Sequence, residues 1–403
     1  MSVLVIGAGP AGLAAAAALV ARGHRPIVVD REPEAGGIPR FCPHPTFGLA
    51  DAFRPMTGPA WARRLAARAA GADLRLGVTV TALGPDGAVT LSDAAGERTI
   101  RPERVLLATG ARETPRAARL VSGDRPRHVL TTGALQRLLA TGGGLPFSRP
   151  VIVGSELVAF SAALQLREHG ARPVAMIEEA PRIAARRPAD LAARLLLGVP
   201  ILTGHKLAAI RARPDDASRL DCVLLRDPSG AERALPCDAV VLTGRFVPEA
   251  ALLPGLDPGA GGPAIDQCWR LAEPRLYAAG NLLRPIETAG WAAAEGRAAA
   301  HALADDLDGR LPAPGRRIPL VAADPLRLVV PSAIAVPGPQ PGPLQMCVRM
   351  ARPATGRLTL AADGAVFWRS RRLAALPERR LRLTRALPDL TGVATLAAGF
   401  EED

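Results

Sequence analysis

A glycine motif near the start of the chain constrains the fold more than any other feature. It reads GAGPAG from Gly7 to Gly12, follows the short apolar run 2–6, and opens an alanine-rich stretch at 11–22. In a strand–turn–helix unit, the first glycine permits a tight turn and the second lets a diphosphate approach the backbone, while the third lets helix and strand pack closely. The helix N-terminus adds free N–H groups and a partial positive charge. The motif therefore predicts a βαβ unit that binds a dinucleotide.

An acidic residue stands where such a unit needs one. Asp30 ends the second apolar run at 27–30, eighteen residues after Gly12. A carboxylate at the end of this strand accepts hydrogen bonds from the adenosine ribose hydroxyls. Three features point to the same kind of unit: the glycines, the small Ala16 one helical turn further on, and this acid. A nucleotide site is therefore favoured over an incidental glycine turn.

The same pattern of elements occurs twice along the chain. A second strand–turn–helix–strand unit covers 151–178, short alternating strands at 73–100 and 206–236 predict β-meander insertions, and the first unit resumes at 276–307. From about residue 311, prolines separate short β-like runs, and Asp363-Gly364 is typical of a hairpin turn. We predict an α/β protein with two nested Rossmann-like FAD/NAD(P)-binding domains and a small C-terminal β domain. The predicted boundaries are 1–120 with 245–310, then 121–244, then 311–403.

The second unit departs from the glycine motif at one position. Gly154 is present, but Glu156 stands where the second glycine belongs. A carboxylate there hinders the binding of a diphosphate by its size and repels it by its charge. The repulsion between two close like charges is about 4 kcal/mol at an effective dielectric near 20. We predict a degenerate, structural second domain in which NAD(P) binding is doubtful. Glu178 or Glu179, at the end of the next strand, can still bind a ribose. Binding of an adenine nucleotide in a different pose therefore remains an alternative.

Charge and composition exclude some classes of function. The formal net charge is +12, yet the basic residues are scattered arginines, Lys206 is the single lysine, and only 3% of residues are aromatic. These features argue against a nucleic-acid partner, while a basic face that docks an acidic protein or attracts an anionic substrate remains open. Glycines and a proline interrupt the apolar N-terminus, and no other run is long enough to span a membrane, so we expect a cytoplasmic protein.

The cysteines do not form a recognisable redox or metal motif. All five are far apart in the sequence, without a C-x-x-C pair, which argues against zinc, an iron–sulfur cluster or any other metal site. Cys42 stands alone, which also argues against dithiol chemistry. His44 is either a proton-transfer group near the cofactor or a turn histidine beside two prolines. Arg40 and Arg112 are either partners of a carboxylate or phosphate, or surface arginines.

Two further segments carry a resemblance to a known superfamily. Residues 107–111 read LATGA and residues 276–281 read LYAAGN. With the first glycine motif and Gly36-Gly37, they resemble the FAD domain of glutathione-reductase-like flavoproteins with two dinucleotide domains. The resemblance implies FAD as the cofactor and a chain that returns over it at Thr109. It also implies that Asn281 replaces the acid that holds the ribityl chain, and that the helix starting near Thr288 points at the flavin pyrimidine.

Four stretches favour a narrower group within this superfamily: 36–40, 57–60, 108–113 and 280–291. They resemble the alpha-type subunits of hydrogen cyanide synthase, opine oxidase and proline or hydroxyproline dehydrogenase, over roughly residues 1–300. The resemblance implies a second, D-amino-acid-oxidase-like flavoprotein subunit that oxidises a small amine or amino acid. Relatives often carry a cysteine-rich [2Fe-2S] segment that this chain lacks, which implies a separate small iron–sulfur electron carrier.

Three hypotheses for the function remain open at this point. The first is an electron-relaying FAD subunit of a heteromeric amino-acid or amine dehydrogenase. The second is a self-contained NAD(P)H-dependent flavoprotein reductase, and the third is a non-catalytic assembly subunit. No catalytic residue can be named. The predicted cofactor contacts are Gly7, Gly9, Pro10, Ala11, Gly12, Asp30, Arg31, Gly36, Gly37, Arg40, Val80, Ala108, Thr109, Gly110, Gly280, Asn281 and Thr288.

Overall fold

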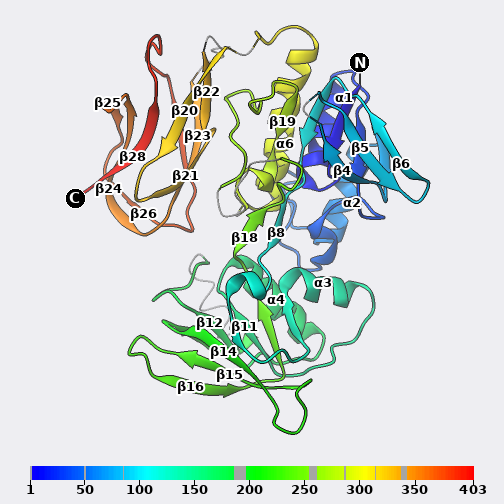
Figure 1. Ribbon diagram of the computed structural model, residues 1–403, viewed down its shortest axis with the longest axis vertical. Coiled ribbons are helices and arrows are strands. Elements are labelled where there is room, and N and C mark those ends of the chain that lie inside the picture. The colour runs from blue at the N-terminus through cyan, green and yellow to red at the C-terminus, as the bar shows by residue number, and fades with distance from the viewer. Residues whose placement is uncertain are drawn as a thin grey trace.

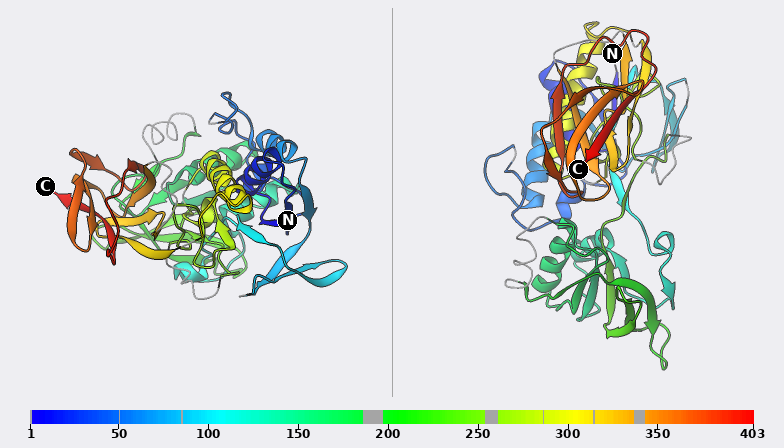
Figure 2. Two further views of the ribbon diagram at one scale, coloured as in Figure 1. Left: turned by 90° about the horizontal axis from the view of Figure 1, so that it is seen from above. Right: turned by 90° about the vertical axis from the view of Figure 1, so that its left-hand side faces the viewer.

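The chain folds into two α/β parts and one β part. The computed structural model describes residues 2–49, 51–84, 86–185, 197–253, 261–285, 287–313, 315–336 and 343–403. Figure 1 shows the first α/β part, the second α/β part below it, and the C-terminal strands beside the first part. Both views of Figure 2 place the C-terminal strands against the first part on the side of helix α6 (Ala289–Leu307). The remaining ranges, including 254–260 and 337–342 of the predicted domains, lie outside the described residues.

Five parallel strands form the sheet of the first part, in the order β19-β7-β1-β2-β3. They are β1 (Val3–Ile6), β2 (Ile27–Asp30), β3 (Asp73–Leu76), β7 (Arg104–Leu107) and β19 (Leu276–Ala278). Alternate side chains of β1 enter two different cores, because successive residues of a strand point to opposite faces. Val3 and Val5 pack with helices α1 (Pro10–Ala21), α2 (Gly58–Arg68) and α6, whereas Leu4 and Ile6 face the meander.

The meander contains three antiparallel strands, β4 (Thr79–Leu83), β5 (Val89–Asp93) and β6 (Gly96–Ile100). The predicted meander begins at residue 73, but Asp73–Leu76 instead forms the edge strand β3 of the parallel sheet. The difference arises because this segment pairs with β2 in register from Ile27 to Asp30, a contact that its own sequence pattern does not specify.

The second part repeats the parallel arrangement. Its sheet has the order β10-β17-β11-β12-β13, built from β10 (Val129–Thr131), β11 (Pro150–Val153), β12 (Ala175–Glu178), β13 (Ile201–Thr203) and β17 (Ala239–Leu242). Helices α3 (Thr132–Ala140) and α4 (Leu157–Glu168) belong to this part. So does a sheet in which β14 (Lys206–Ala212), β15 (Leu220–Arg226) and β16 (Glu232–Pro236) are antiparallel, while β9 (Ser122–Gly123) pairs with β14 in parallel.

Two antiparallel strands connect the parts. The chain leaves the first sheet through β8 (Ala111–Glu113) and returns through β18 (Phe246–Pro248), and Figure 1 shows both running between the parts. Short 3-10 turns complete the two parts at η1 (Ile38–Phe41), η2 (Ala117–Arg119) and η4 (Gly280–Leu282). The nested α/β arrangement predicted from the sequence is confirmed.

The C-terminal part is built from strands, as predicted. One sheet contains β20 (Arg316–Ala322), β22 (Ala333–Val336), β24 (Ala354–Ala362), β25 (Ala365–Arg369), β26 (Leu373–Ala375) and β28 (Leu396–Glu402); the other contains β21 (Leu326–Val330), β23 (Leu344–Met350) and β27 (Leu381–Arg385). A shared apolar core joins the sheets. Asp363 and Gly364 link β24 to β25 with positive φ at both residues, the geometry of the predicted hairpin turn. None of the described helices is long and apolar enough to cross a membrane.

Candidate functional site

The turn after β1 packs so tightly that two of its glycines have no room for a side chain. A Cβ on Gly7 would lie 2.5 Å from the carbonyl oxygen of Ala108, and a Cβ on Gly12 would lie 1.8 Å from that of Gly7. Gly7 also has a φ of +106°, which favours glycine. The start of α1 is therefore held directly against the carboxyl ends of β1 and β7.

Gly9 differs from its two neighbours because the position of its Cβ is open, with no atom within 4 Å. It is the N-cap residue of α1, and no side chain caps the helix. Gly37 lies against this turn, since its Cβ would be 3.0 Å from Gly9 Cα, and Gly36 N–H donates to the Ala8 carbonyl at 2.8 Å. Uncapped N–H groups beside open space suit an anion such as a diphosphate.

Asp30 holds the glycine turn in place. One carboxylate oxygen accepts a hydrogen bond from Ala8 N–H at 2.6 Å, and the other accepts from Glu32 N–H at 2.9 Å. Each oxygen keeps a further lone pair that can accept from a hydroxyl. Asp30 therefore shapes the turn and keeps acceptor capacity on both carboxylate oxygens.

The segment 108–110 connects the first sheet to the strand that returns from the second part. Ala108 N–H donates to the Ile6 carbonyl at 2.8 Å. The Thr109 hydroxyl donates to the Glu249 carbonyl at 2.7 Å, and Glu249 N–H donates to the Gly110 carbonyl at 2.9 Å. Thr109 thus uses its hydroxyl to join the two crossing segments, a partner that the sequence did not reveal.

The segment 280–288 brings the start of α6 to the same edge of the sheet. A Cβ on Gly280 would lie 2.8 Å from Ala11 Cβ, so α6 and α1 begin side by side. The Asn281 side chain makes two hydrogen bonds of 3.1 Å to the backbone of Glu287, one as donor and one as acceptor. Thr288 is the N-cap residue of α6 and is exposed. Asn281 therefore fixes the turn before α6, where the sequence predicted a contact to the cofactor.

Three other predicted contact residues, Arg31, Arg40 and Val80, differ in where their side chains lie. Arg31 is exposed. Arg40 does contact the segment beside the Gly9 turn, because its Nε donates to the Gly37 carbonyl at 3.4 Å while the guanidinium forms ion pairs with Glu32 and Glu34 at 3.2 and 3.3 Å. The Arg137 and Arg40 guanidinium groups lower the pKa of Glu32. Val80 lies on β4 and packs against the core beneath the meander. Among the described residues, no group of three or more histidine, cysteine or acidic side chains is arranged to hold a metal ion.

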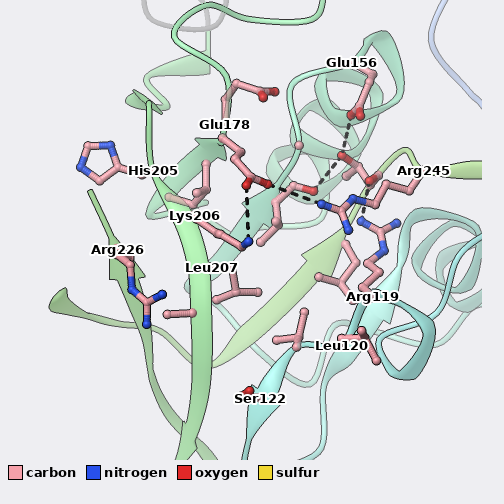
Figure 3. Close-up of a pocket in the computed structure, with 18 residues that line it drawn as sticks. Arg119, Leu120, Ser122, Glu156, Glu178, His205, Lys206, Leu207, Arg226 and Arg245 are labelled. Atoms are coloured by element: carbon pink, nitrogen blue, oxygen red, sulfur yellow. Dashed lines mark hydrogen bonds and ion pairs between the residues drawn. The ribbon is translucent and has the colours of Figure 1, made fainter. Parts of the chain in front are cut away.

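The second part contains a cavity of about 470 Å³ at the carboxyl ends of β11, β12 and β17 (Figure 3). This is the point where the strand order of the sheet reverses, which is where open α/β sheets bind ligands. Its charged lining consists of Arg119, Lys206, Arg226 and Arg245 with Glu156, Glu178 and Glu179. Glu178 is engaged within the chain, since it accepts hydrogen bonds from the Ser155 hydroxyl and from Ala180 N–H.

Comparison with known proteins identifies the family. Residues 1–296 match the family described as pyridine nucleotide-disulphide oxidoreductase. The chain belongs to this family. Its members are oxidoreductases that bind FAD and NAD(P), so the cofactor expected from the sequence, FAD, is confirmed at the level of the family. The assignment of individual contact residues remains a prediction.

Two curated relatives match different shares of this oxidoreductase. One of the subunits of opine oxidase from Rhizobium meliloti (strain 1021) is 35% identical over 184 residues, which is 44% of this chain and 38% of that protein. Ferredoxin–NADP reductase of Saccharopolyspora erythraea is 28% identical over 289 residues, covering 70% of this chain and 85% of that protein. The matches to opine oxidase subunits span 36% to 51% of their length.

The fold is shared with solved structures. Thioredoxin reductase of T. acidophilum superposes with a TM-score of 0.64 at 23% identity, covering 76% of this chain and 98% of that protein. This likeness supports the α/β arrangement described above.

The cysteines of this oxidoreductase are all free and buried. Cys42 accepts a hydrogen bond from the Gln136 amide at 3.4 Å, and burial raises the pKa of its thiol to about 11. His44 nearby has both ring nitrogens engaged, by Ser161 at 2.6 Å and by Thr46 at 2.8 Å, and burial lowers its pKa. Since Gln136 lies on α3 and Ser161 on α4, both Cys42 and His44 contact the second part of the molecule.

Sequence reasoning missed a buried ionic cluster around Glu287, whose side chain is 2% exposed. Arg349 of β23 contacts one carboxylate oxygen at 2.8 Å and Arg284 contacts the same oxygen at 3.3 Å, while Arg380 pairs with the other. The C-terminal part is thereby tied to the turn that precedes α6. No local pattern could have revealed Arg349 and Arg380 as partners, because they come from segments far away in the sequence.

Proposed function

We propose that this oxidoreductase is the FAD-holding, electron-relaying alpha-type subunit of a heteromeric dehydrogenase. Its substrate would be an amino acid or related amine, such as an opine, proline or a glycine-like compound. The observation that carries the proposal is the open, uncapped turn at Gly9, in a chain 35% identical over 184 residues to one of the subunits of opine oxidase. The matched residues make up 38% of that relative, so substrate and assembly are part of the proposal.

We assign the roles of the residues in the first part from their geometry. The N–H groups of the Gly9 turn bind the diphosphate, and Asp30 accepts from the adenosine ribose while it holds Ala8. We assign Gly36-Gly37 and residues 108–110 to the border of the cofactor because Gly37 lies against Gly9 and Ala108 lies against Gly7. The exposed start of α6 at Thr288 directs N–H groups toward the flavin pyrimidine. Bound FAD would supply the redox chemistry that these residues lack.

Two kinds of partner follow from this assignment. A second, D-amino-acid-oxidase-like flavoprotein subunit would bind and oxidise the substrate, and a small iron–sulfur protein would carry electrons away. The relative from Rhizobium meliloti is named as one subunit of its enzyme, which supports a multi-subunit assembly. The net charge of +12 favours association with an acidic electron carrier.

Cofactor content and partner content test the proposal together. We expect purified protein to be yellow, to release FAD on denaturation and to be reduced and reoxidised reversibly without air. Co-expression with candidate flavoprotein subunits should give a complex that oxidises an amino acid and reduces a dye, whereas the separate components should not. A folded, colourless protein that refuses added FAD would contradict the proposal. A protein that binds FAD without reversible reduction would instead favour a non-catalytic assembly role.

One finding favours a second candidate function, an NAD(P)H-dependent flavoprotein reductase. The chain covers 85% of a ferredoxin–NADP reductase at 28% identity, and its second part contains a cavity at the strand ends. Anaerobic mixing with NADH or NADPH separates the two candidates. Rapid bleaching of the flavin would support the reductase, and an unchanged flavin spectrum is expected of the dehydrogenase subunit.

A further inference from the structure

The turn before α4 repeats the geometry of the turn before α1, with one change. Gly154 N–H donates to the Ile177 carbonyl at 2.8 Å, as Gly7 N–H donates to that of Val29 at the same distance. Gly154 has a positive φ of +124°, as Gly7 has a positive φ of +106°. Glu156 is the N-cap residue of α4 with extended backbone angles, like Gly9 before α1. Glu156 therefore occupies the position at which the first part keeps open space.

The Glu156 side chain turns into the crevice between two strand ends. It accepts a hydrogen bond from the Thr243 hydroxyl at 3.0 Å, marked by the dashed line from Glu156 in Figure 3. A Cβ on Gly244 would lie 2.0 Å from one carboxylate oxygen, and a Cβ on Gly154 would lie 2.6 Å from the other. The carboxylate thus fills the space above the loops that follow β11 and β17. Burial raises the pKa of Glu156, which agrees with its enclosed position.

Three cations around the cavity already have partners within the chain. Arg119 donates to the carbonyls of Thr243 and Gly244, both at 2.8 Å, and of Thr114 at 2.7 Å. Arg245 and Lys206 each pair with Glu179 at 3.5 Å. Because these cations are engaged, a diphosphate entering at α4 would meet the Glu156 carboxylate first. The Glu156 side chain makes no capping hydrogen bond to α4, and its carboxylate lies instead beside Thr243 and Gly244.

We infer that Glu156 is a specificity residue that closes the diphosphate subsite of the second nucleotide-binding fold, so that the cavity does not bind NADH or NADPH. The residues present do not fit a pyridine nucleotide, although the family is named for one. Exclusion follows from the space that the carboxylate fills and from its charge. The exclusion of NADH and NADPH does not depend on the proposed function. The further step, that electrons reach the flavin from a partner subunit and not from a nicotinamide, rests on the proposed function.

Direct binding measurements on variants of the full chain test the inference. Titration calorimetry and nucleotide fluorescence would compare NADH and NADPH binding by wild type, Glu156→Gly and Glu156→Gln. Glycine suits both the N-cap position and the backbone angles of Glu156, so the fold should survive. Glu168→Gln is the matched control, because it removes the same charge from the exposed opposite end of α4. Circular dichroism and thermal unfolding would establish that each variant is folded.

We expect no saturable binding by wild type or Glu168→Gln up to millimolar nucleotide. Affinity should rise by at least about 100-fold in Glu156→Gly, which restores both space and neutrality, and by about 10-fold in Glu156→Gln, which removes the charge alone. Micromolar binding by wild type would overturn the inference, as would folded Glu156 variants that bind no better than wild type. A colourless protein would count against the proposed function only. The binding assay would still be valid, because the heat and fluorescence that it measures come from the added nucleotide and not from the flavin.

Discussion

Glycine serves two different purposes within one turn after β1. Gly7 and Gly12 are required by packing, because a Cβ at either would collide with backbone carbonyl oxygens. Gly9 is required by no neighbour within the chain, since its Cβ would meet nothing within 4 Å. The space beside Gly9 is thus available to a ligand. For these single residues, folding and cofactor binding can therefore be separated experimentally.

Substitution by alanine should distinguish the two purposes. We expect Gly12→Ala to lower the free energy of unfolding of the apoprotein by about 3 kcal/mol or more, because the backbone of α1 must move away from β1. Gly9→Ala should cost about 1 kcal/mol or less but weaken FAD binding by roughly 10- to 100-fold, because its methyl group projects into the ligand space. Urea unfolding of apoprotein and FAD titration measure the two quantities. Equal losses of stability in both variants would contradict this separation.

The start of α6 depends on strands of the C-terminal part. Asn281 fixes the backbone at Glu287, and the Glu287 carboxylate is surrounded by three guanidinium groups in a buried setting. Arg380 also stacks over the ring of Trp291 in the first turn of α6, with 4.0 Å between the guanidinium carbon and the ring centroid. Among the elements, β23 and the segment before β27 therefore support the helix end that we assign to the flavin.

Removing the charge of Glu287 should lower the free energy of unfolding. Glu287→Gln leaves buried arginines without their shared carboxylate, and we expect a loss of about 3 kcal/mol in the free energy of unfolding. The control is Glu402→Gln, which breaks an exposed pair with Arg352 and should leave the unfolding midpoint unchanged. Urea unfolding followed by circular dichroism would measure both variants. Similar midpoints for Glu287→Gln and wild type would show that the cluster does not anchor α6.

Across the molecule as a whole, polar side chains link the three parts. His44 and Cys42 of the first part contact Ser161 and Gln136 of the second, and Arg137 pairs with Glu32 across the same boundary at 2.7 Å. Glu378 of the C-terminal part pairs with Arg182, which follows β12 in the second part. These contacts oppose rotation of the second part about the two strands β8 and β18.

The His44 contact predicts a dependence of stability on pH. Burial lowers the pKa of His44, with a smaller opposing effect of Glu168, so folding favours the neutral ring. The stabilisation is present above the unfolded pKa of about 6.5 and is lost as the pH falls through the lower folded value. We expect wild type to lose more stability than His44→Asn between pH 7 and pH 5. His301→Asn, at an exposed position on α6, should follow wild type; a parallel decline in all three proteins would exclude His44 as the cause.

FAD as the cofactor was implied by the resemblance of several segments to a known superfamily. The nested α/β fold and the hairpin at Asp363-Gly364 could be predicted from the order of the amino acids. These features depend on residues close together in the chain, such as the spacing of Gly7, Gly9 and Gly12 or the alternation along a strand, and local sterics decide them. The same reasoning singled out Glu156 as the residue that departs from the second glycine motif.

The direction of several side chains, in contrast, could be learned only from the folded molecule. Folding joined residues 73–76 to the first sheet, turned Asn281 toward the Glu287 backbone, gave Thr109 a partner in Glu249 and brought Arg349 to Glu287. Each of these contacts joins segments that the chain separates by a turn, a strand or a whole domain. The partner of a side chain depends on which segments the fold brings next to each other. The spacing of residues in the sequence carries no information about the distance between such segments in space.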